Sequence, residues 1–125
     1  MKTVIALVAM GNENLEKTFR KLFSDARSSG SKKVIINVIS DQPFHKVVDH
    51  IREAMLDNID IGYELFLWKK DETEKVLEKT AEMQVEGVLL YCDTENRNII
   101  EKIFSQLPNK IRANLLKDNC RNPSQ

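Results

Sequence analysis

The sequence has no excess of charge of either sign and no long apolar run. Nineteen basic and nineteen acidic side chains give a formal net charge of zero, so no global field would attract nucleic acid or an anionic membrane surface. No apolar run in the chain approaches the roughly 18 residues that a membrane-spanning helix requires. We therefore expect neither nucleic acid nor a membrane among the partners of this chain.

Cysteine is also scarce, since Cys92 and Cys120 are the only two in 125 residues. The pair forms no CxxC motif, and a small secreted domain would more often carry several disulfides. The apolar stretch at residues 3–9 follows a single positive charge and leads into Gly11 without a small-x-small cleavage pattern, which disfavours a signal peptide. The sequence therefore indicates a reducing, cytoplasmic setting and a buried strand at residues 3–9.

Short apolar runs mark the predicted strands. Residues 3–9, 34–39 and 87–92 are nearly continuous apolar runs, the pattern of strands that are buried on both faces of a parallel sheet. Residues 59–68 alternate instead, which predicts a half-exposed strand near a sheet edge. On that strand Phe66 and Trp68 are core residues if a helix covers them, and an apolar partner or dimer surface if none does.

Between these strands, apolar residues recur at the spacing of helices. They fall at offsets such as 0, 3 or 4, 7 and 11, which places them on one face of each helix. The predicted faces carry Leu15, Phe19, Leu22, Phe23 and Ala26; Phe44, Val47, Val48, Ile51 and Met55; Val76, Leu77, Thr80, Ala81 and Gln84; and Ile99, Ile100, Ile103, Phe104 and Leu107.

This alternation predicts an α/β fold with one domain over residues 1–116. We expect a doubly wound, mostly parallel sheet of four or five strands with helices on both faces, Rossmann-like and in the strand order 3-2-1-4-5. Residues 110–116 predict either a fifth, edge strand or a frayed helix. Residues 117–125 have almost no apolar side chains and are expected to form a flexible tail.

The ligand crevice of an open α/β sheet lies at the carboxyl ends of its central strands, where the strand order reverses. The candidate ligand-binding residues at that edge are Met10, Gly11, Asn12, Asn37, Cys92 and Asp93. Cys92 would end a central strand beside a helix N-terminus, which favours a reactive thiolate. A small buried apolar side chain is the simpler explanation of this cysteine.

The histidines do not predict a metal site. His45 and His50 are five residues apart, which places them about 140° apart around a helix and prevents chelation from one face. His45 and Asp49 have a compatible spacing but lack an evident third ligand. We therefore expect no metal ion.

Four stretches of the chain carry a family likeness. They are VAMGNENLEK at residues 8–17, INVI at 36–39, KDETEKVL at 70–77 and VEGVLLY at 85–91. Together they resemble the framework of universal stress protein domains over most of the chain. The resemblance implies the same α/β fold and a regulatory or stress-related role.

The sequence departs from the ATP-binding members of that family at two places. Those members carry an aspartate at the end of the first strand, where this chain has Met10, and a glycine-rich loop after the fourth strand, where this chain has CDTENR at residues 92–97. Glycines let backbone amides close around phosphate, whereas Asp93 and Glu95 would place negative charge there. The resemblance therefore implies a member that does not bind ATP in the usual way.

These features favour a module that binds a small ligand or another protein over an enzyme, because no acid, base and oxyanion donor can be named at plausible mutual distances. We expect no cofactor, and a homodimer that forms through an edge strand. Two alternatives stay open: a degenerate nucleotide-binding domain for ATP or a cyclic nucleotide, and a flavodoxin-like or receiver-like domain. The second is disfavoured because residues 10–14 lack a hydroxyl-rich phosphate loop.

Overall fold

The computed structural model describes residues 2–56 and 60–120, except for the side chain of Asn12. Strands and helices alternate along these residues, and none of their helices is both long and apolar enough to cross a membrane. The elements are β1 (Thr3–Ala9), η1 (Asn12–Asn14), α1 (Leu15–Ser28), β2 (Lys33–Ile39), α2 (Phe44–Met55), β3 (Gly62–Trp68), α3 (Thr73–Ala81), β4 (Val88–Cys92), η2 (Thr94–Asn96), α4 (Arg97–Ser105), α5 (Asn109–Arg112) and β5 (Leu115–Asp118).

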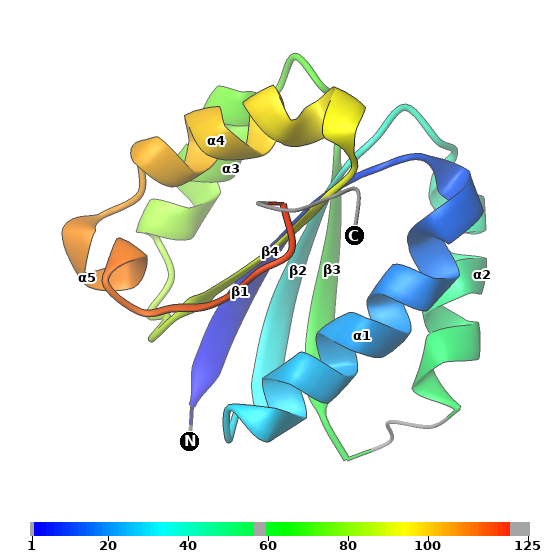
Figure 1. Cartoon of the computed structure of the whole chain (residues 1–125), viewed down its shortest axis with the longest axis horizontal. Coiled ribbons are helices and arrows are strands. Elements are labelled where there is room, and N and C mark those ends of the chain that lie inside the picture. Colours follow the sequence, from blue (N-terminus) through cyan, green and yellow to red (C-terminus); the bar gives the residue numbers. More distant parts are fainter. Residues whose placement is uncertain (1, 57–59, 121–125) are drawn as a thin grey trace.

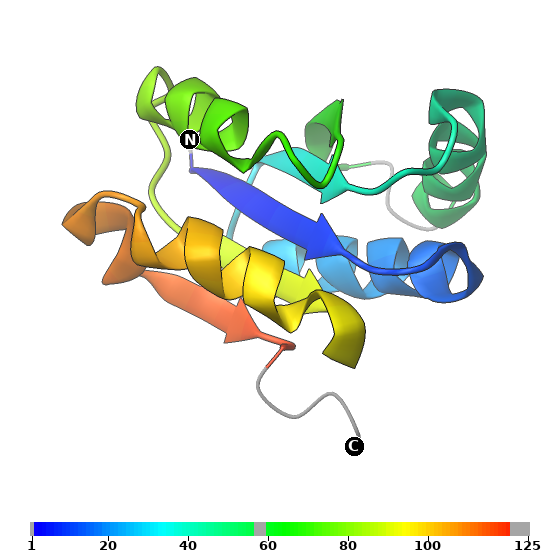
Figure 2. The ribbon, with the colours of Figure 1, turned by 90° about the horizontal axis from the view of Figure 1, so that it is seen from above.

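The five strands form one parallel sheet in the order β3-β2-β1-β4-β5. Helices α1 and α2 cover one face of this sheet, and α3 and α4 cover the other (Figures 1 and 2). The predicted doubly wound fold and its strand order are therefore confirmed. The arrangement follows from right-handed crossovers, which place α1 and α2 on one face as the chain moves from β1 to β3, and α3 and α4 on the other face as it moves back to β4 and β5.

Strand β1 lies at the centre of the sheet, and its residues Val4 to Ala9 have no exposed surface. Alternate side chains enter two separate cores, because successive residues of a strand point to opposite faces. Val4, Ala6 and Val8 pack under α1 and α2, whereas Ile5, Leu7 and Ala9 pack under α3 and α4. The continuous apolar run of β1 thus reports burial on both sides, as its sequence predicts.

A buried polar contact supports the first of these cores. The Tyr91 hydroxyl on β4 donates a hydrogen bond of 2.8 Å to Oδ2 of Asp25 on α1. Burial, and then this bond to Asp25, raises the pKa of Tyr91 far above its ordinary value. The tyrosine therefore keeps its proton, and the contact ties α1 to the centre of the sheet.

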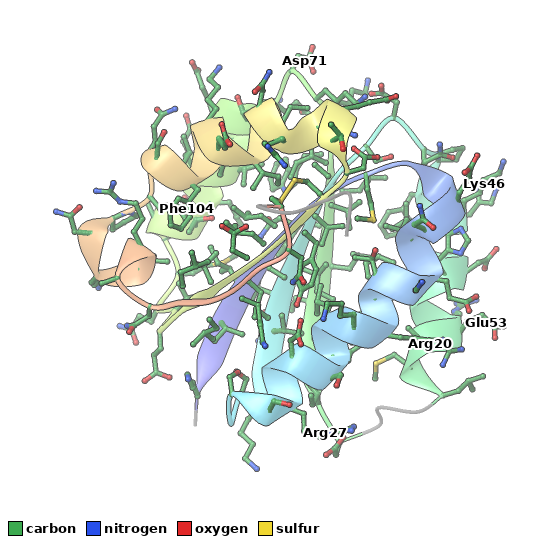
Figure 3. The ribbon with its side chains drawn as sticks, viewed as in Figure 1. Arg20, Arg27, Lys46, Glu53, Asp71 and Phe104 are labelled. Carbon is green, nitrogen blue, oxygen red and sulfur yellow. A yellow bond between two sulfur atoms is a disulfide. The ribbon has the colours of Figure 1, made fainter. Side chains whose placement is uncertain are left out.

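Helices α1 and α2 are also joined along their outer sides. Arg20, which lies on α1 toward α2 (Figure 3), donates from Nη2 to the Glu53 carbonyl oxygen at 3.1 Å. Arg27 at the end of α1 pairs with Asp60 at 2.8 Å, and this guanidinium lowers the pKa of the Asp60 carboxyl. Both contacts are exposed to solvent, so they orient α1 against α2 and against the turn before β3 more than they stabilise the fold.

Strand β3 is the half-exposed edge strand that the alternating pattern predicts. It begins at Gly62, after a turn at Asp60 and a bend at Ile61, and the predicted start at residue 59 lies outside the described residues. Phe66 and Trp68 pack against the core beneath α3, their rings stack with centroids 6.1 Å apart, and the Lys79 ammonium lies 5.3 Å from the Phe66 ring. This placement fits the first of the two interpretations of Phe66 and Trp68, in which a helix covers them and they are core residues.

The structure differs from the predicted C-terminal boundary. Residues 109–112 form helix α5 and residues 115–118 form strand β5, so neither a strand nor a helix alone accounts for this region. Because β5 pairs with β4 and Cys120 is only 4% exposed, the expected boundary at residue 116 is too early. Low apolar content predicted a flexible tail from residue 117 onward, but strand pairing holds Lys117 and Asp118 and a disulfide holds Cys120. Residues 121–125 lie outside the described residues.

The two cysteines also differ from expectation, because Cys92 and Cys120 form a disulfide (Figure 3). Their Cα atoms are 5.1 Å apart although 28 positions separate them in the sequence. The pairing arises because β5 runs parallel to β4, so the residues just beyond Asp118 reach the carboxyl end of β4. Sequence spacing carries no signal of this contact, which depends on the order of strands in the sheet.

Loss of this disulfide should destabilise the fold without preventing it. A loop closed over 28 residues corresponds to about 3–4 kcal/mol of unfolding free energy in the chain-entropy model. We expect Cys120→Ser to lower the unfolding free energy by about this amount in urea denaturation. Adding a reductant should lower the stability of the wild type similarly and leave that of the variant unchanged. An equal response of both proteins to reductant would contradict this assignment.

Candidate functional site

The carboxyl ends of β1, β2 and β4 meet at one edge of the sheet, where two adjoining hollows of about 550 and 160 Å³ open to solvent. We call these two hollows together the carboxyl-edge crevice. Gly11, Gln42, Asp93 and Glu95 line both of them. The crevice lies between β1 and β4, where the strand order reverses, and this is the usual ligand position of an open α/β sheet.

Asp93 is the structural centre of the crevice. Its Oδ2 accepts a hydrogen bond of 3.0 Å from the Gly11 backbone N–H, which links the loop after β4 to the loop after β1. Its Oδ1 accepts from the Asn96 backbone N–H at 3.1 Å and from Asn96 Nδ2 at 2.6 Å, so the carboxylate also caps η2. Because both oxygens are occupied by protein donors, Asp93 shapes the crevice more than it offers a free ligand group.

Met10 supplies an apolar wall of the crevice. Its side chain is half-buried, lines the smaller hollow and receives a hydrogen bond on Sδ from the Thr18 hydroxyl at 2.7 Å. A thioether is a weak acceptor and carries no charge. This position therefore cannot coordinate a magnesium ion or bind a ribose hydroxyl as a carboxylate would.

Three of the six candidate residues come together here: Met10, Gly11 and Asp93. The backbone of Asn12 belongs to η1, and its side chain lies outside the described part of the structure.

Asn37 lies outside the crevice, contrary to expectation. It is 1% exposed on the sheet face beneath α3, where its Oδ1 accepts from Trp68 Nε1 at 2.9 Å. Its Nδ2 finds no hydrogen-bond partner among the described residues. The two-residue period of the strand explains the error, because Asn37 shares its face with the core residues Ile35 and Ile39.

Cys92 is also misplaced by the sequence prediction. It is 4% exposed, belongs to the core beneath α3 and α4, and is bonded to Cys120. It therefore cannot serve as a thiolate in the crevice while that bond is intact. Of the two explanations that the sequence offered for Cys92, the small buried side chain accounts for its position.

The crevice has an acidic lining. Four carboxylates face it, from Glu13, Asp41, Asp93 and Glu95, against one ammonium from Lys70. Glu13, Asp41 and Glu95 are exposed. Such a lining opposes the approach of a triphosphate and favours a ligand that carries positive charge or several hydrogen-bond donors.

A third hollow of about 400 Å³ continues from Ser40, Asp41 and Gln42 toward Trp68. Glu72 closes it: Oε1 accepts from the Lys69 backbone N–H at 2.7 Å and Oε2 from the Lys75 ammonium at 3.0 Å. The Lys69 N–H, and then Lys75, lowers the pKa of the Glu72 carboxyl. Glu72 is therefore ionised at neutral pH, and its charge is paired with that of Lys75.

The sequence prediction did not include Gln42, which lines all three hollows. It follows the short turn after β2, where Ser40 Oγ accepts a hydrogen bond from the Gln42 backbone N–H at 3.1 Å. The Ser-Asp-Gln-Pro sequence before α2 was the available signal, because such residues form turns at strand ends. In residues 2–56 and 60–120, no three His, Cys, Asp or Glu side chains converge as metal ligands would.

Asp93 provides a direct test of this geometry. Asp93→Ala removes the cap of η2 and the link to Gly11, and should cost about 1–2 kcal/mol of unfolding free energy. Asp93→Asn keeps an acceptor for Asn96 and loses the second acceptor for Gly11, so it should cost about half as much. Urea denaturation of the three proteins measures this order. Equal stability of the wild type and the alanine variant would show that these bonds do not hold the crevice.

Comparison with known proteins adds relatives but no activity. No curated protein matches the chain. The crystal structure of a hypothetical protein from Sulfolobus tokodaii is similar, with a TM-score of 0.93, 49% sequence identity and 98% of each chain covered. Residues 6–121 match the model of a family described as "Family of unknown function (DUF5751)". Because the match spans nearly the whole described domain, the chain belongs to this family of unknown function.

Proposed function

We propose that this protein is a regulatory or stress-related module that binds a small ligand in the carboxyl-edge crevice and has no catalytic role. The observation that carries the proposal is the convergence of the loops after β1, β2 and β4 into adjoining hollows at the reversal of strand order. Sites of open α/β sheets lie at this position because the loops can vary there without disturbing the core.

The charge of the crevice indicates the chemistry of the ligand. Its four carboxylates and single lysine favour a small polar molecule with an amino or guanidino group. Such a molecule would bind Glu13, Glu95 and Asp41, whose carboxylates are exposed, while Asp93 keeps the loops in place. The relation to universal stress proteins belongs to this proposal, in the form of a member without the usual ATP motif.

The two alternatives differ in how well the structure supports them. A degenerate nucleotide site for ATP or a cyclic nucleotide has the crevice in its favour, but the carboxylates and the absence of a glycine-rich loop after β4 argue against it. A flavodoxin-like or receiver-like domain would have the strand order 2-1-3-4-5. The order found here is 3-2-1-4-5, which disfavours that alternative.

A cytoplasmic location is part of the same proposal. It rests on the scarcity of cysteine in the sequence. The disulfide between Cys92 and Cys120 argues against it, because disulfides are rare in a reducing compartment.

Thermal denaturation in the presence of chosen ligands tests the proposed site. Putrescine, a small diamine, at about 100 times its dissociation constant should add about 2.7 kcal/mol of stability, or roughly 10 °C in Tm for a domain of this size. ATP and cyclic AMP at the same concentration should leave Tm unchanged. A rise in Tm with a nucleotide and not with the diamine would favour the degenerate nucleotide site.

Variants of the crevice locate the effect. Glu13→Gln combined with Glu95→Gln removes two exposed carboxylates and should abolish the diamine response. Glu82→Gln is the matched control, because this exposed carboxylate follows α3, away from the residues that line the crevice. Equal responses of the two variants would show that the diamine binds elsewhere.

A second candidate function is self-association through β3, which the contrast between the two sheet edges favours. Native proteins protect edges with short strands, bulges and charges. The β5 edge has four residues, an irregular register at Val88/Leu89 and the exposed Lys117, whereas β3 has seven residues and only one charge, Glu64. The β3 edge is therefore the one that a second copy of this chain would cover.

The hydrogen-bond pattern shows which groups would pair. The Gly62 N–H and the Trp68 carbonyl both point to β2, and alternate residues of a parallel strand face the same neighbour. The N–H and C=O groups of Tyr63, Leu65 and Leu67 therefore face outward and can pair with an antiparallel β3 across a two-fold axis.

A proline at the outer edge tests this dimer. Leu65→Pro removes an outward N–H and leaves the bonds to β2 in place, so it should yield a monomer in light scattering after gel filtration. Leu65→Val retains the N–H and should remain a dimer with the wild type. A monomeric wild type, or a dimeric proline variant, would refute association through β3.

A further inference from the structure

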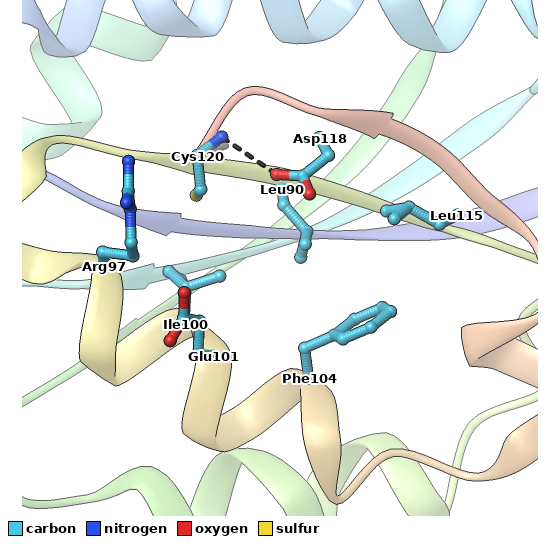
Figure 4. Close-up of a pocket in the computed structure, with 8 residues that line it drawn as sticks. All are labelled: Leu90, Arg97, Ile100, Glu101, Phe104, Leu115, Asp118 and Cys120. Carbon is cyan, nitrogen blue, oxygen red and sulfur yellow. Dashed lines mark hydrogen bonds between the residues drawn. The ribbon is translucent and has the colours of Figure 1, made fainter. Parts of the chain in front are cut away.

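A cavity separate from the carboxyl-edge crevice lies between α4 and β5 (Figure 4). Its volume is about 180 Å³, and Leu90, Ile100, Phe104 and Leu115 form its apolar walls. Arg97, Glu101 and Asp118 add one positive and two negative charges to the lining. For comparison, an engineered apolar cavity of about 150 Å³ in another protein binds benzene, so the body of a ligand here would be about the size of one aromatic ring.

Cys120 forms part of the wall of this cavity, and the disulfide to Cys92 fixes it there. Other contacts also hold the segment. Strand β5 pairs with β4 alone, over four residues and with an irregular register, and Leu115 and Leu116 pack against the two cores. Beyond Asp118, the Asn119 N–H donates to the Leu90 carbonyl at 2.9 Å, and the Cys120 N–H donates to Asp118 Oδ1 at 3.0 Å. The bond between the two sulfurs adds a covalent restraint to this wall.

We propose that this cavity is a binding site for a small molecule with an apolar body the size of one aromatic ring, and that the Cys92–Cys120 disulfide closes it to larger ligands. The polar end of the ligand lies beside Arg97, Glu101 and Asp118, which also line the cavity. The apolar body packs against Phe104 and Leu115, which are half-buried and lose further solvent contact when the cavity is filled.

Reduction opens the site. A dithiol reductant attacks one sulfur of the bridge, forms a mixed disulfide and then closes its own disulfide. Two electrons and two protons pass to the protein, which leaves Cys92 and Cys120 as thiols. Both cysteines are only 4% exposed, so the reductant acts when the segment at residues 115–120 opens locally, as edge elements with few contacts do.

Two probes of different size test the cavity as a binding site and the role of the disulfide in limiting access to it. Phenol, which has a single aromatic ring and one hydroxyl, should bind the oxidised protein in saturation-transfer NMR. Leu115→Trp fills the cavity and should abolish the phenol signal, whereas Leu56→Trp, at a position that is 71% exposed, should not. Absence of phenol binding, or equal binding by both tryptophan variants, would overturn the site.

The larger dye anilinonaphthalene sulfonate tests the disulfide. Its fluorescence should rise several-fold on addition of dithiothreitol and in Cys120→Ser, and Leu115→Trp should suppress the rise. Hydrogen exchange should increase at residues 115–120 while the amides of β1 and β2 stay protected. Unchanged fluorescence, or an increase in exchange spread evenly over the whole domain, would show that the disulfide only stabilises the fold.

Discussion

The burial of β1 on both faces is the constraint on which the rest of this structure depends. Six consecutive residues, Val4 to Ala9, lose all contact with solvent, and each face requires its own layer of helices. The chain supplies α1 and α2 for one face and α3 and α4 for the other. From β1 the chain first adds strands on one side, β2 and β3, and then on the other, β4 and β5. The strand order therefore reverses between β1 and β4, so the order that buries the central strand also creates the crevice beside it.

The crevice and the cavity differ in how the fold makes them. The crevice consists of loops at the carboxyl ends of strands. Some of its carboxylates are exposed, as in Glu95, whereas that of Asp93 accepts hydrogen bonds that hold the loops together. The cavity lies inside the last layer, where the short β5 meets α4. The crevice suits polar ligands and the cavity suits apolar ones, because only the cavity is shielded by core side chains.

The C-terminal layer combines weak pairing with one covalent bond. The strand β5 is short and irregular, yet Cys120 beyond it is as buried as Cys92. A strand with this little apolar surface would open readily without the disulfide, since local stability follows the number of buried contacts. The opposite edge, β3, has the reverse character: it is longer and more apolar, and it is held by pairing with β2 and by side chains that pack against both cores.

The sequence by itself determined the class of fold, the four main strands and the helices between them, because burial on one or two faces leaves a period that can be read along the chain. It also placed Met10, Gly11 and Asp93 at one edge, since parallel strands bring their carboxyl ends together. Only the tertiary structure decided that Asn37 points into the core, that Cys92 meets Cys120 and that residues 117–120 belong to the domain. These depend on which face of a strand a residue occupies and on which strands become neighbours, and both are set by contacts between residues far apart in sequence.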